Sequence, residues 1–324
     1  MFRLNKRLLI LVVIVGLMSW FISGCENKGK EEGIVAKVDD EIITQKEFDE
    51  DFELAKKVRQ QQFGEDILSQ EVGDNKVYED ILREDLLGTL IIEKVINKDL
   101  DEMNIAVTDK EVEEALKDRY IAEMGGEEQY KEYLENNGIT EEAFKRDLKR
   151  VLTFEKHRED FFNKVDLPED EVKEYFDKNK DSFIKIRASH ILVRTEEEGN
   201  KILEKLKKGE DFHNLVGMES ADIDSAVQGG DLGYFTRDSL LEGYKSIGDV
   251  ALKLKKGEIS GLIKTEVGYH IILIEDRIDR YEDLKEDVIL TLKYKKHNEK
   301  ILDLKEKANI KIYMDKDRDS NKND

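Results

Sequence analysis

Two short, β-branched apolar runs that each carry a histidine constrain the fold of this chain more than any other feature. The first run covers 186–193 and contains His190, and the second covers 269–274 and contains His270. Because successive side chains of a strand point to opposite faces, each histidine shares a strand face with aliphatic neighbours. If the two strands pair in one sheet, the two imidazoles are expected side by side on it.

The chain between the two runs shows the start and stop signals of helices and one glycine-rich turn. A capping box begins at Thr195, where a hydroxyl can accept from a backbone N–H, and Gly209 ends the helix that follows. Gly257 ends a second helical stretch, and the motif Gly-Gly-Asp-Leu-Gly at 229–233 marks a turn. The pattern predicts an α+β fold in which helices pack around a small antiparallel sheet.

Length and charge limit the remaining possibilities. The 324 residues favour two domains, and 40% of them are charged, with a net charge of −21 and a single proline. This acidic balance argues against nucleic acid or a bare anionic membrane surface as the ligand, because both repel a negative protein. Most of the charge is interpreted as solvated helix faces.

The N-terminus has the layout of a secretory signal. Three basic residues precede an apolar run of 15 residues over 8–22, which is short for a membrane span and fits a signal peptide. The run leads through Ser-Gly to Cys25, the sole cysteine, so no intramolecular disulfide can form. Small residues before a cysteine resemble a bacterial lipobox, which implies cleavage before Cys25 and lipidation of its thiol. An uncleaved N-terminal anchor is the alternative, and both place the protein outside the cytoplasm, held to a membrane.

The region from 44 to 180 contains only helical patterns, delimited by capping boxes, glycines and one proline. The aromatic side chains in these helices are interpreted as core, and the alternative is that some line an apolar groove for unfolded chains. The expected helices run from Thr44 to about Phe63, from a cap at Asp74 to beyond Val95, from Thr108 to the glycines at 125–126, onward to about Asn136, from Thr140 to about Val165, and from Pro168 to about Asn179.

The end of the chain returns to a strand pattern. An amphipathic helix is expected over 283–307, followed by a strand over 309–313. We expect this strand to pair with a hairpin over 34–43, which has apolar arms on both sides of Asp39 and Asp40. The segment around the two histidines would then be inserted into a domain made by both ends of the chain.

The motifs around the two histidines together resemble the parvulin family of peptidyl-prolyl cis-trans isomerases. The matching pieces are the Ala-Ser-His-Ile-Leu-Val strand, two Lys-Lys-Gly-Glu helix ends, the Gly-Gly-Asp-Leu-Gly turn and the Gly-Tyr-His-Ile-Ile strand. The order of signal, hairpin, helices, parvulin-like segment and final strand resembles the PrsA foldases of Gram-positive bacteria, with a layout related to SurA. The resemblance implies a four-stranded antiparallel sheet with surrounding helices. The expected divisions are a signal peptide over 1–24, a tether over 25–33, a helical chaperone-like domain over 34–182, a parvulin domain over 183–278, a helix and strand completing the helical domain over 279–314, and a disordered tail over 315–324.

The resemblance also implies the site residues. His190 and His270 match the paired histidines of the family, Thr265 matches its nearby hydroxyl, and Asp222 is expected to be the acid that faces the substrate amide. Ile223 stands where many parvulins have a cysteine, and leucine replaces methionine and one aromatic residue in the proline pocket. The expected pocket residues are Leu232, Phe235, Leu240, Tyr244 and Leu252, with Leu240 and Tyr244 four apart on a helix.

The chemistry implied by this resemblance is rotation about an X–Pro bond, with a barrier of roughly 18–20 kcal/mol from amide resonance. An apolar pocket would favour the twisted, less polar amide, and a donor or carbonyl-facing group would assist. The remaining histidines, His157, His213 and His297, lie in charged helical stretches and are expected at the surface. Five scattered histidines and one cysteine give no metal-ligand spacing, so neither metal nor cofactor is expected.

Three functions are compatible with these patterns. The first is a lipid-anchored foldase that isomerises X–Pro bonds in incompletely folded secreted polypeptides, and dimerisation through its helical part stays open. The second is a non-catalytic holdase chaperone with a degenerate parvulin domain. A solute-binding lipoprotein shares the lipobox, but it predicts two lobes of repeated strand–helix units that this sequence lacks.

Overall fold

The computed structural model describes residues 33–73 and 76–314 and divides the chain into two compact units. The helical unit contains the described residues up to Val165 and from Lys296 onward, and the sheet unit runs from Asp166 to Lys295. The expected signal peptide, Cys25 and the 315–324 tail lie outside the described residues. Within the described ranges, no helix is long and apolar enough to cross a bilayer.

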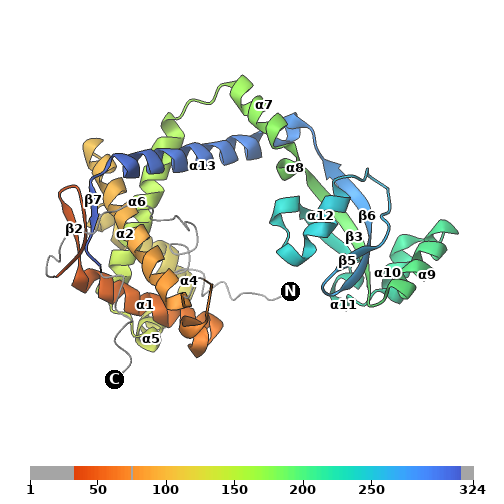
Figure 1. Cartoon of the computed structure of the whole chain (residues 1–324), viewed down its shortest axis with the longest axis horizontal. Helices are drawn as coiled ribbons and strands as arrows, with labels where there is room; N and C mark the ends of the chain where they lie inside the picture. Colours follow the sequence, from red (N-terminus) through yellow and green to blue (C-terminus); the bar gives the residue numbers. More distant parts are fainter. Residues whose placement is uncertain (1–32, 74–75, 315–324) are drawn as a thin grey trace. The chain divides into compact units, whose positions relative to one another are not determined.

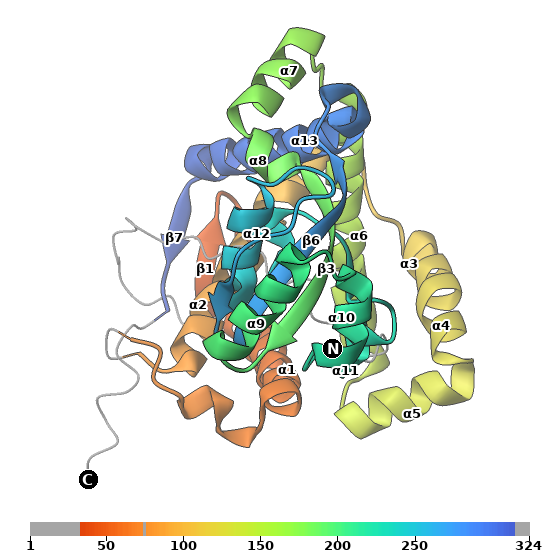
Figure 2. The same cartoon turned by 90° about the vertical axis from the view of Figure 1, so that its right-hand side faces the viewer.

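A three-stranded antiparallel sheet joins the two ends of the chain in the helical unit (Figures 1 and 2). Its strands are β1 (Ile34–Val38), β2 (Glu41–Thr44) and β7 (Ile310–Ile312), with β1 in the centre. Ala36 faces Ile312 in the pairing of β1 with β7. The expectation that the final strand pairs with the N-terminal hairpin is confirmed, and the sheet unit is therefore an insertion.

Helices make up the rest of the helical unit, and side-chain caps begin several of them. The hydroxyls of Thr44, Thr108 and Thr140 each accept a hydrogen bond from the backbone N–H three residues later. The second long helix starts later than expected, after Val77, whose N–H donates to Asp80; Asp74 lies outside the described residues. The helices are α1 (Gln45–Phe63), a 3₁₀ turn (Glu65–Ser69), α2 (Tyr78–Glu102), α3 (Asp109–Ala115), a π-helical turn (Leu116–Ile121), α4 (Ala122–Met124), α5 (Glu127–Asn137) and α6 (Glu141–Lys164).

With one exception, the aromatic side chains of these helices are buried or half-buried, and the buried ones form core as the first of the two interpretations predicts. Phe48 and Phe52 are buried against the sheet and α2, and Tyr130 and Phe144 are buried in a second cluster around α3, α5 and α6. Phe63, at the end of α1, is the exception, with 61% of its surface exposed. The buried rings are not available to line an open groove.

The sheet unit is built on a four-stranded antiparallel sheet in the order β4-β3-β6-β5. Helices cover both faces, with α9 and α10 on one and α12 on the other (Figure 1). Alternation along β3 sends Ile191 to the α10 face and Ala188 to the α12 face. The elements are β3 (Lys185–Val193), α9 (Glu196–Lys207), α10 (Phe212–Glu219), α11 (Ile223–Ala226), β4 (Asp231–Phe235), two 3₁₀ turns (Arg237–Ser239 and Glu242–Tyr244), α12 (Lys245–Ala251), β5 (Ile263–Thr265) and β6 (Gly268–Ile278).

The compact sheet unit extends beyond the 183–278 limits expected for the parvulin domain. Its additional parts are α7 (Glu169–Lys178), α8 (Lys180–Phe183) and the first half of α13 (Tyr281–Lys307). These helices share one buried cluster, so they belong to one packed body with the sheet. The buried members are Val172, Phe176, Phe183, Leu284, Val288 and Leu292.

Candidate active site

The two histidines of the apolar runs lie side by side on adjacent strands. His190 on β3 faces Ile272, and His270 on β6 faces Leu192, so the histidines are diagonal neighbours on one sheet face. Their Nδ1 atoms are 3.0 Å apart, and the ring planes differ by only 22°. Both side chains are almost fully buried, at 4% and 1% exposure. Strand alternation and pairing register therefore suffice to bring the imidazoles into contact.

Polar side chains extend this contact at both ends. Asp222 Oδ2 lies 2.8 Å from His190 Nε2, and Thr265 Oγ1 lies 2.9 Å from His270 Nε2. A residue that the sequence analysis did not single out, Ser225, lies 3.0 Å from His190 Nε2 and donates to Asp222 over 2.8 Å. The sequence signal that could have identified Ser225 is its position three residues after Asp222. Asp222 caps α11 and accepts from the Ser225 N–H.

The protonation states follow from burial and from these partners. Burial alone raises the pKa of Asp222, but the hydrogen bonds from Ser225 and His190 outweigh it and leave the pKa below its usual value. Burial lowers the pKa of His190 in spite of the nearby Asp222. Burial, followed by the neighbouring His190, lowers the pKa of His270 to about 4. At neutral pH the site thus holds one carboxylate and two uncharged imidazoles.

This charge state permits one consistent direction of donation. The carboxylate of Asp222 only accepts, so His190 donates from Nε2 and accepts at Nδ1. His270 then donates from Nδ1 to His190, and its Nε2 accepts from the hydroxyl of Thr265. Four side chains from different elements are thereby joined in a single chain of hydrogen bonds.

A glycine turn holds the backbone around His190. Gly230 has a φ of +79°, and a Cβ at this position would lie only 2.4 Å from the carbonyl oxygen of His190. The Gly230 carbonyl accepts from the His190 N–H over 2.9 Å, and its own N–H donates to the carbonyl of Ser225 over 2.8 Å. The Gly-Gly-Asp-Leu-Gly motif thus connects the strand of His190 to α11, which carries Ser225.

Four of the five expected pocket residues lie in one apolar cluster beside the histidines. Phe235, Leu240, Tyr244 and Leu252 pack with the α12 side of the sheet, whereas Leu232 is 37% exposed and lies outside the cluster. The ring of Tyr244 meets that of His270 edge-on, with centroids 6.0 Å apart. An apolar wall therefore adjoins the histidine pair.

The expectation that Leu240 and Tyr244 share one helix is wrong. Leu240 has extended backbone angles and separates the 3₁₀ turn that ends at Ser239 from the turn Glu242–Tyr244. Thr236 caps the start of the first turn, and the extended angles of Leu240 (φ −77°, ψ 142°) end it. The two side chains still pack against the same apolar cluster.

A second histidine pair lies in the helical unit, and the expectation that its members are at the surface is wrong. His157 and His297 are 1% and 5% exposed, with His157 Nδ1 2.8 Å from His297 Nε2. Asp99 lies 2.9 Å from the other ring nitrogen of His157 and accepts from Lys300 over 2.6 Å. Of the three, only His213 has a substantially exposed side chain, at 47%.

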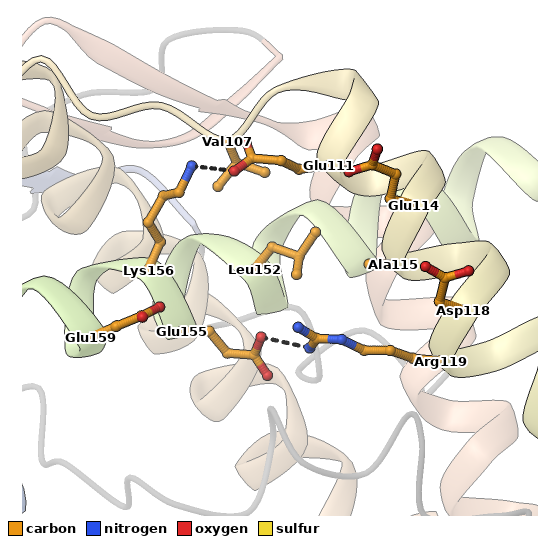
Figure 3. A pocket seen from close by; sticks show the side chains of 10 residues that line it. All are labelled: Val107, Glu111, Glu114, Ala115, Asp118, Arg119, Leu152, Glu155, Lys156 and Glu159. Carbon is orange, nitrogen blue, oxygen red and sulfur yellow. Dashed lines mark hydrogen bonds and ion pairs between the residues drawn. The ribbon is translucent and has the colours of Figure 1, made fainter.

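The described residues contain no group of three or more His, Cys, Asp or Glu side chains arranged to hold a metal ion. A hollow of about 310 Å³ lies in the helical unit between the π-helical turn and α6 (Figure 3). Leu152 and Ala115 give it an apolar floor, and two ion pairs cross it, Lys156–Glu111 at 2.6 Å and Arg119–Glu155 at 2.8 Å. Its remaining lining residues are Val107, Glu114, Asp118 and Glu159.

Comparisons with known proteins match both units. Residues 1–158 match the family model of the SurA-like N-terminal domain, and residues 188–276 match the PPIC-type PPIase domain. The chain is 30% identical to the foldase protein PrsA of Clostridium tetani, over 94% of this chain and 95% of that protein. It is 32% identical to the foldase protein PrsA of Caldanaerobacter subterraneus, over 84% and 83%. A solved structure of peptidylprolyl isomerase PrsA from Bacillus anthracis matches 68% of this chain and 95% of that one, with 30% identity and a TM-score of 0.40.

Proposed function

Because this chain belongs to the PrsA family of foldases and carries a parvulin-type peptidyl-prolyl isomerase domain, we propose that it isomerises X–Pro bonds in secreted polypeptides through its His190–His270 site. The observation that carries the proposal is the continuous chain from Asp222 through both imidazoles to Thr265, next to an apolar wall. Polypeptides that are still folding present X–Pro bonds in both isomers and are the substrate class that fits.

The apolar wall acts on the polarity of the amide. A planar X–Pro amide is polar and is stabilised by water, whereas the twisted amide has lost resonance and part of its polarity. Phe235, Leu240, Tyr244 and Leu252 would surround the proline ring and exclude water, which disfavours the planar state relative to the twisted one. Lowering the barrier by about 5 kcal/mol would accelerate rotation by more than about 10³-fold.

The histidine pair would supply an uncharged, oriented surface for the amide carbonyl. Two neutral imidazoles do not stabilise the charge that resonance places on the planar carbonyl oxygen, so the carbonyl can lose charge as it twists. Asp222 and Thr265 fix the two tautomers at the ends of the chain. Asp222, 30% exposed at its side chain, is the charged group of the site that a substrate amide can approach.

We expect the departures from the family pattern to weaken binding of the proline substrate more than they slow the bond rotation. Ile223, at the usual cysteine position, is 72% exposed and provides no thiol. Leucine at 240 and 252 gives less ring contact to proline than an aromatic residue would, so we expect a raised KM. Both histidines of the His190–His270 pair, which would act on the twisting bond, are present.

Lipid anchoring through Cys25 is part of the proposal. The basic start, the 15-residue apolar run and the small residues before Cys25 support cleavage and lipidation, and thereby an extracytoplasmic position at the cell membrane. Replacement of Cys25 by serine is expected to release the protein from membranes, which fractionation of cells measures. Protein that stays membrane-bound after this change would favour the uncleaved anchor instead.

The isomerase assignment is tested with a proline peptide whose cis–trans exchange is followed by NMR. The double variant His190→Ala, His270→Ala is expected to lose about 100-fold or more in kcat/KM, because the oriented surface at the carbonyl is gone. The single variant Lys201→Ala, on the exposed face of α9, serves as a control that keeps the site. Equal rates for the original chain and the double variant would overturn the proposal.

The hollow of the helical unit favours a second function, the holding of unfolded clients. An apolar floor with charged walls fits extended polypeptide segments that carry both apolar and charged side chains. Suppression of aggregation of a denatured client measures this activity separately from isomerisation. The variant Leu152→Glu, which places a charge on the floor, is expected to weaken suppression and leave the isomerase rate unchanged.

A further inference from the structure

His213 contacts two oxygen atoms that belong to different elements of the sheet unit. Its Nδ1 lies 3.1 Å from the carbonyl oxygen of Gly229, in the glycine turn, and its Nε2 lies 3.3 Å from Glu275 Oε1, on β6. His213 itself is on α10, so the ring connects a helix, a turn and a strand. No catalytic step described above uses this side chain.

Glu275 is placed for this contact by an irregularity in strand pairing. Arg187 of β3 faces Asp276, and the next residue, Ala188, faces Ile274, so Glu275 is the residue that the pairing skips. Its Oε1 atom is buried and has no hydrogen bond among the residues that the structure describes. A buried carboxylate oxygen calls for a partner, and the His213 ring is within ion-pair distance of it, at 3.3 Å, without hydrogen-bond geometry.

The other charged groups near this carboxylate have partners of their own. Arg187 donates to Asp231 over 2.7 Å, and Lys256 pairs with Asp276 at 2.9 Å. On the helix of His213, Asp211 accepts from the Asn214 N–H as the cap of α10. The two ring nitrogens of His213 therefore face one carbonyl and one carboxylate, and a protonated ring would donate to the carbonyl and attract the carboxylate by charge.

The carbonyl that His213 binds is one residue from the backbone of the site. Gly229 precedes Gly230, whose carbonyl accepts from the His190 N–H and whose N–H donates to the Ser225 carbonyl. A shift of the turn would move the strand of His190 relative to Ser225 and Asp222. Both glycines have positive φ, at +71° and +79°, and because glycine backbones are conformationally permissive, the position of this turn depends on the contacts that hold it.

We propose that His213 is a positioning residue of the isomerase site, which ties the Gly229–Gly230 turn to β6 through Glu275 and so keeps His190 in register with Asp222 and Ser225. The inference rests on the proposed function for its effect on turnover. It names a residue outside the motifs that the sequence analysis singled out.

The test compares three variants of the full chain. His213→Ala removes both contacts, His213→Asn keeps a donor where Nδ1 was but cannot reach Glu275, and Asn214→Ala is a matched control on the exposed face of the same helix. We expect His213→Ala to lower kcat about 10-fold with KM unchanged, less than the 10²-fold that a 1 Å misplacement can cost. His213→Asn, which leaves the turn untied from β6, is expected to lose nearly as much as His213→Ala, and Asn214→Ala is expected to equal the original chain.

Ring ¹⁵N chemical shifts of His190 give a second measurement that does not need turnover. They are expected to move in His213→Ala and in His213→Asn, which both lose the contact with Glu275, and to stay in place in Asn214→Ala. An inactive original chain would refute the proposed function and leave the ¹⁵N shifts to decide the positioning role. Unchanged shifts and rates in His213→Ala, or a His213→Asn variant that equals the original chain, would overturn the inference.

Discussion

The molecule contains two buried pairs of histidines in direct contact, and they differ in what lies at their ends. The His190–His270 pair ends in Asp222 and Thr265, both partly exposed, beside an apolar cluster. The His157–His297 pair ends in an ion pair, Asp99–Lys300, and is enclosed by helices α2, α6 and α13. The rings of Phe161 and Phe162 pack against His297, with centroids 5.4 and 6.2 Å away.

The difference teaches that contact between imidazoles does not by itself indicate chemistry. Both pairs are neutral at pH 7, because burial lowers the pKa of His157 and lowers that of His297 to about 4, as it does for His270. Of these two pairs, the one in the sheet unit has a partly exposed carboxylate at its end and an apolar cluster beside it. This difference supports the catalytic role proposed for that pair and a stabilising role in the helical core for the other.

The largest effect is expected when the pair of the helical unit is broken. His157→Ala removes the ring between His297 and Asp99, which leaves a cavity and removes a hydrogen-bond partner from each of these two side chains. We therefore expect a loss of about 3 kcal/mol in the free energy of unfolding. Isomerase turnover per folded molecule is expected to stay unchanged. Urea unfolding monitored by circular dichroism, together with the peptide assay, measures both quantities.

The matched change in the other pair is His270→Ala, which is expected to reduce turnover strongly. If His157→Ala also reduced turnover per folded molecule, the separation of roles between the pairs would be wrong. A loss of stability below about 1 kcal/mol would likewise contradict a core role for His157, since typical surface substitutions fall in that range.

The next largest effect is expected on the free energy of unfolding at acidic pH. For His157, His190, His270 and His297 the folded-state pKa is below the unfolded value of about 6.5, so the unfolded chain binds more protons as pH falls. Their stabilising contribution is complete above pH 6.5 and is lost between pH 6.5 and 4. We expect the free energy of unfolding to fall by about 2 kcal/mol from pH 7 to pH 5.

The double variant His157→Gln, His297→Gln separates the two pairs in this titration. About half of the pH dependence is expected to disappear with it, and the rest belongs to the site pair. Asp147 acts in the opposite direction, because burial raises its pKa to about 6, but it is common to both proteins and cancels in the difference. If the free energy of unfolding of this double variant depended on pH as strongly as that of the original chain, groups other than His157 and His297 would be responsible.

The smallest effect is expected at the Thr265 end of the hydrogen-bond chain that runs through both histidines of the site. Thr265→Val removes the hydroxyl that donates to His270 Nε2 while keeping the shape of the side chain. We expect kcat/KM to fall about 5-fold, which corresponds to about 1 kcal/mol for one lost hydrogen bond. Thr265→Ser retains the donor and is expected to keep most of the activity. A serine variant as slow as the valine variant would show that the methyl group, rather than the hydroxyl, matters.

Much of the fold was predictable because its signals are local. Thr44, Thr108, Thr140 and Thr195 each begin a helix by accepting a backbone hydrogen bond, and this chemistry is visible within four residues of sequence. The pairing of β7 with β1 was predictable for a different reason, because a lone apolar strand at the end of a chain needs an edge to join. The turns at 237–244 were misjudged because a spacing of four is shared by helices and by two closely spaced turns.

The candidate site was predictable only for side chains whose direction is fixed by the alternation of residues along a strand. His190 and His270 share faces with aliphatic residues, so their sides of the sheet follow from period 2. His157 and His297 sit in helices with charged residues on several faces, and which face is buried depends on packing between segments 140 residues apart. Ser225 was missed because its contact with His190 depends on how α11 docks against β3.

The place of β7 at the very end of the chain also sets the timing of assembly. The sheet unit is complete in sequence at Lys295, whereas β1 lacks one neighbour until Ile310–Ile312 has been synthesised. During synthesis from the N-terminus, the inserted unit therefore has all its parts first. The helical unit keeps an open edge at β1 until β7 has been made, and a chain stopped before Ile310 would leave that edge exposed to other polypeptides.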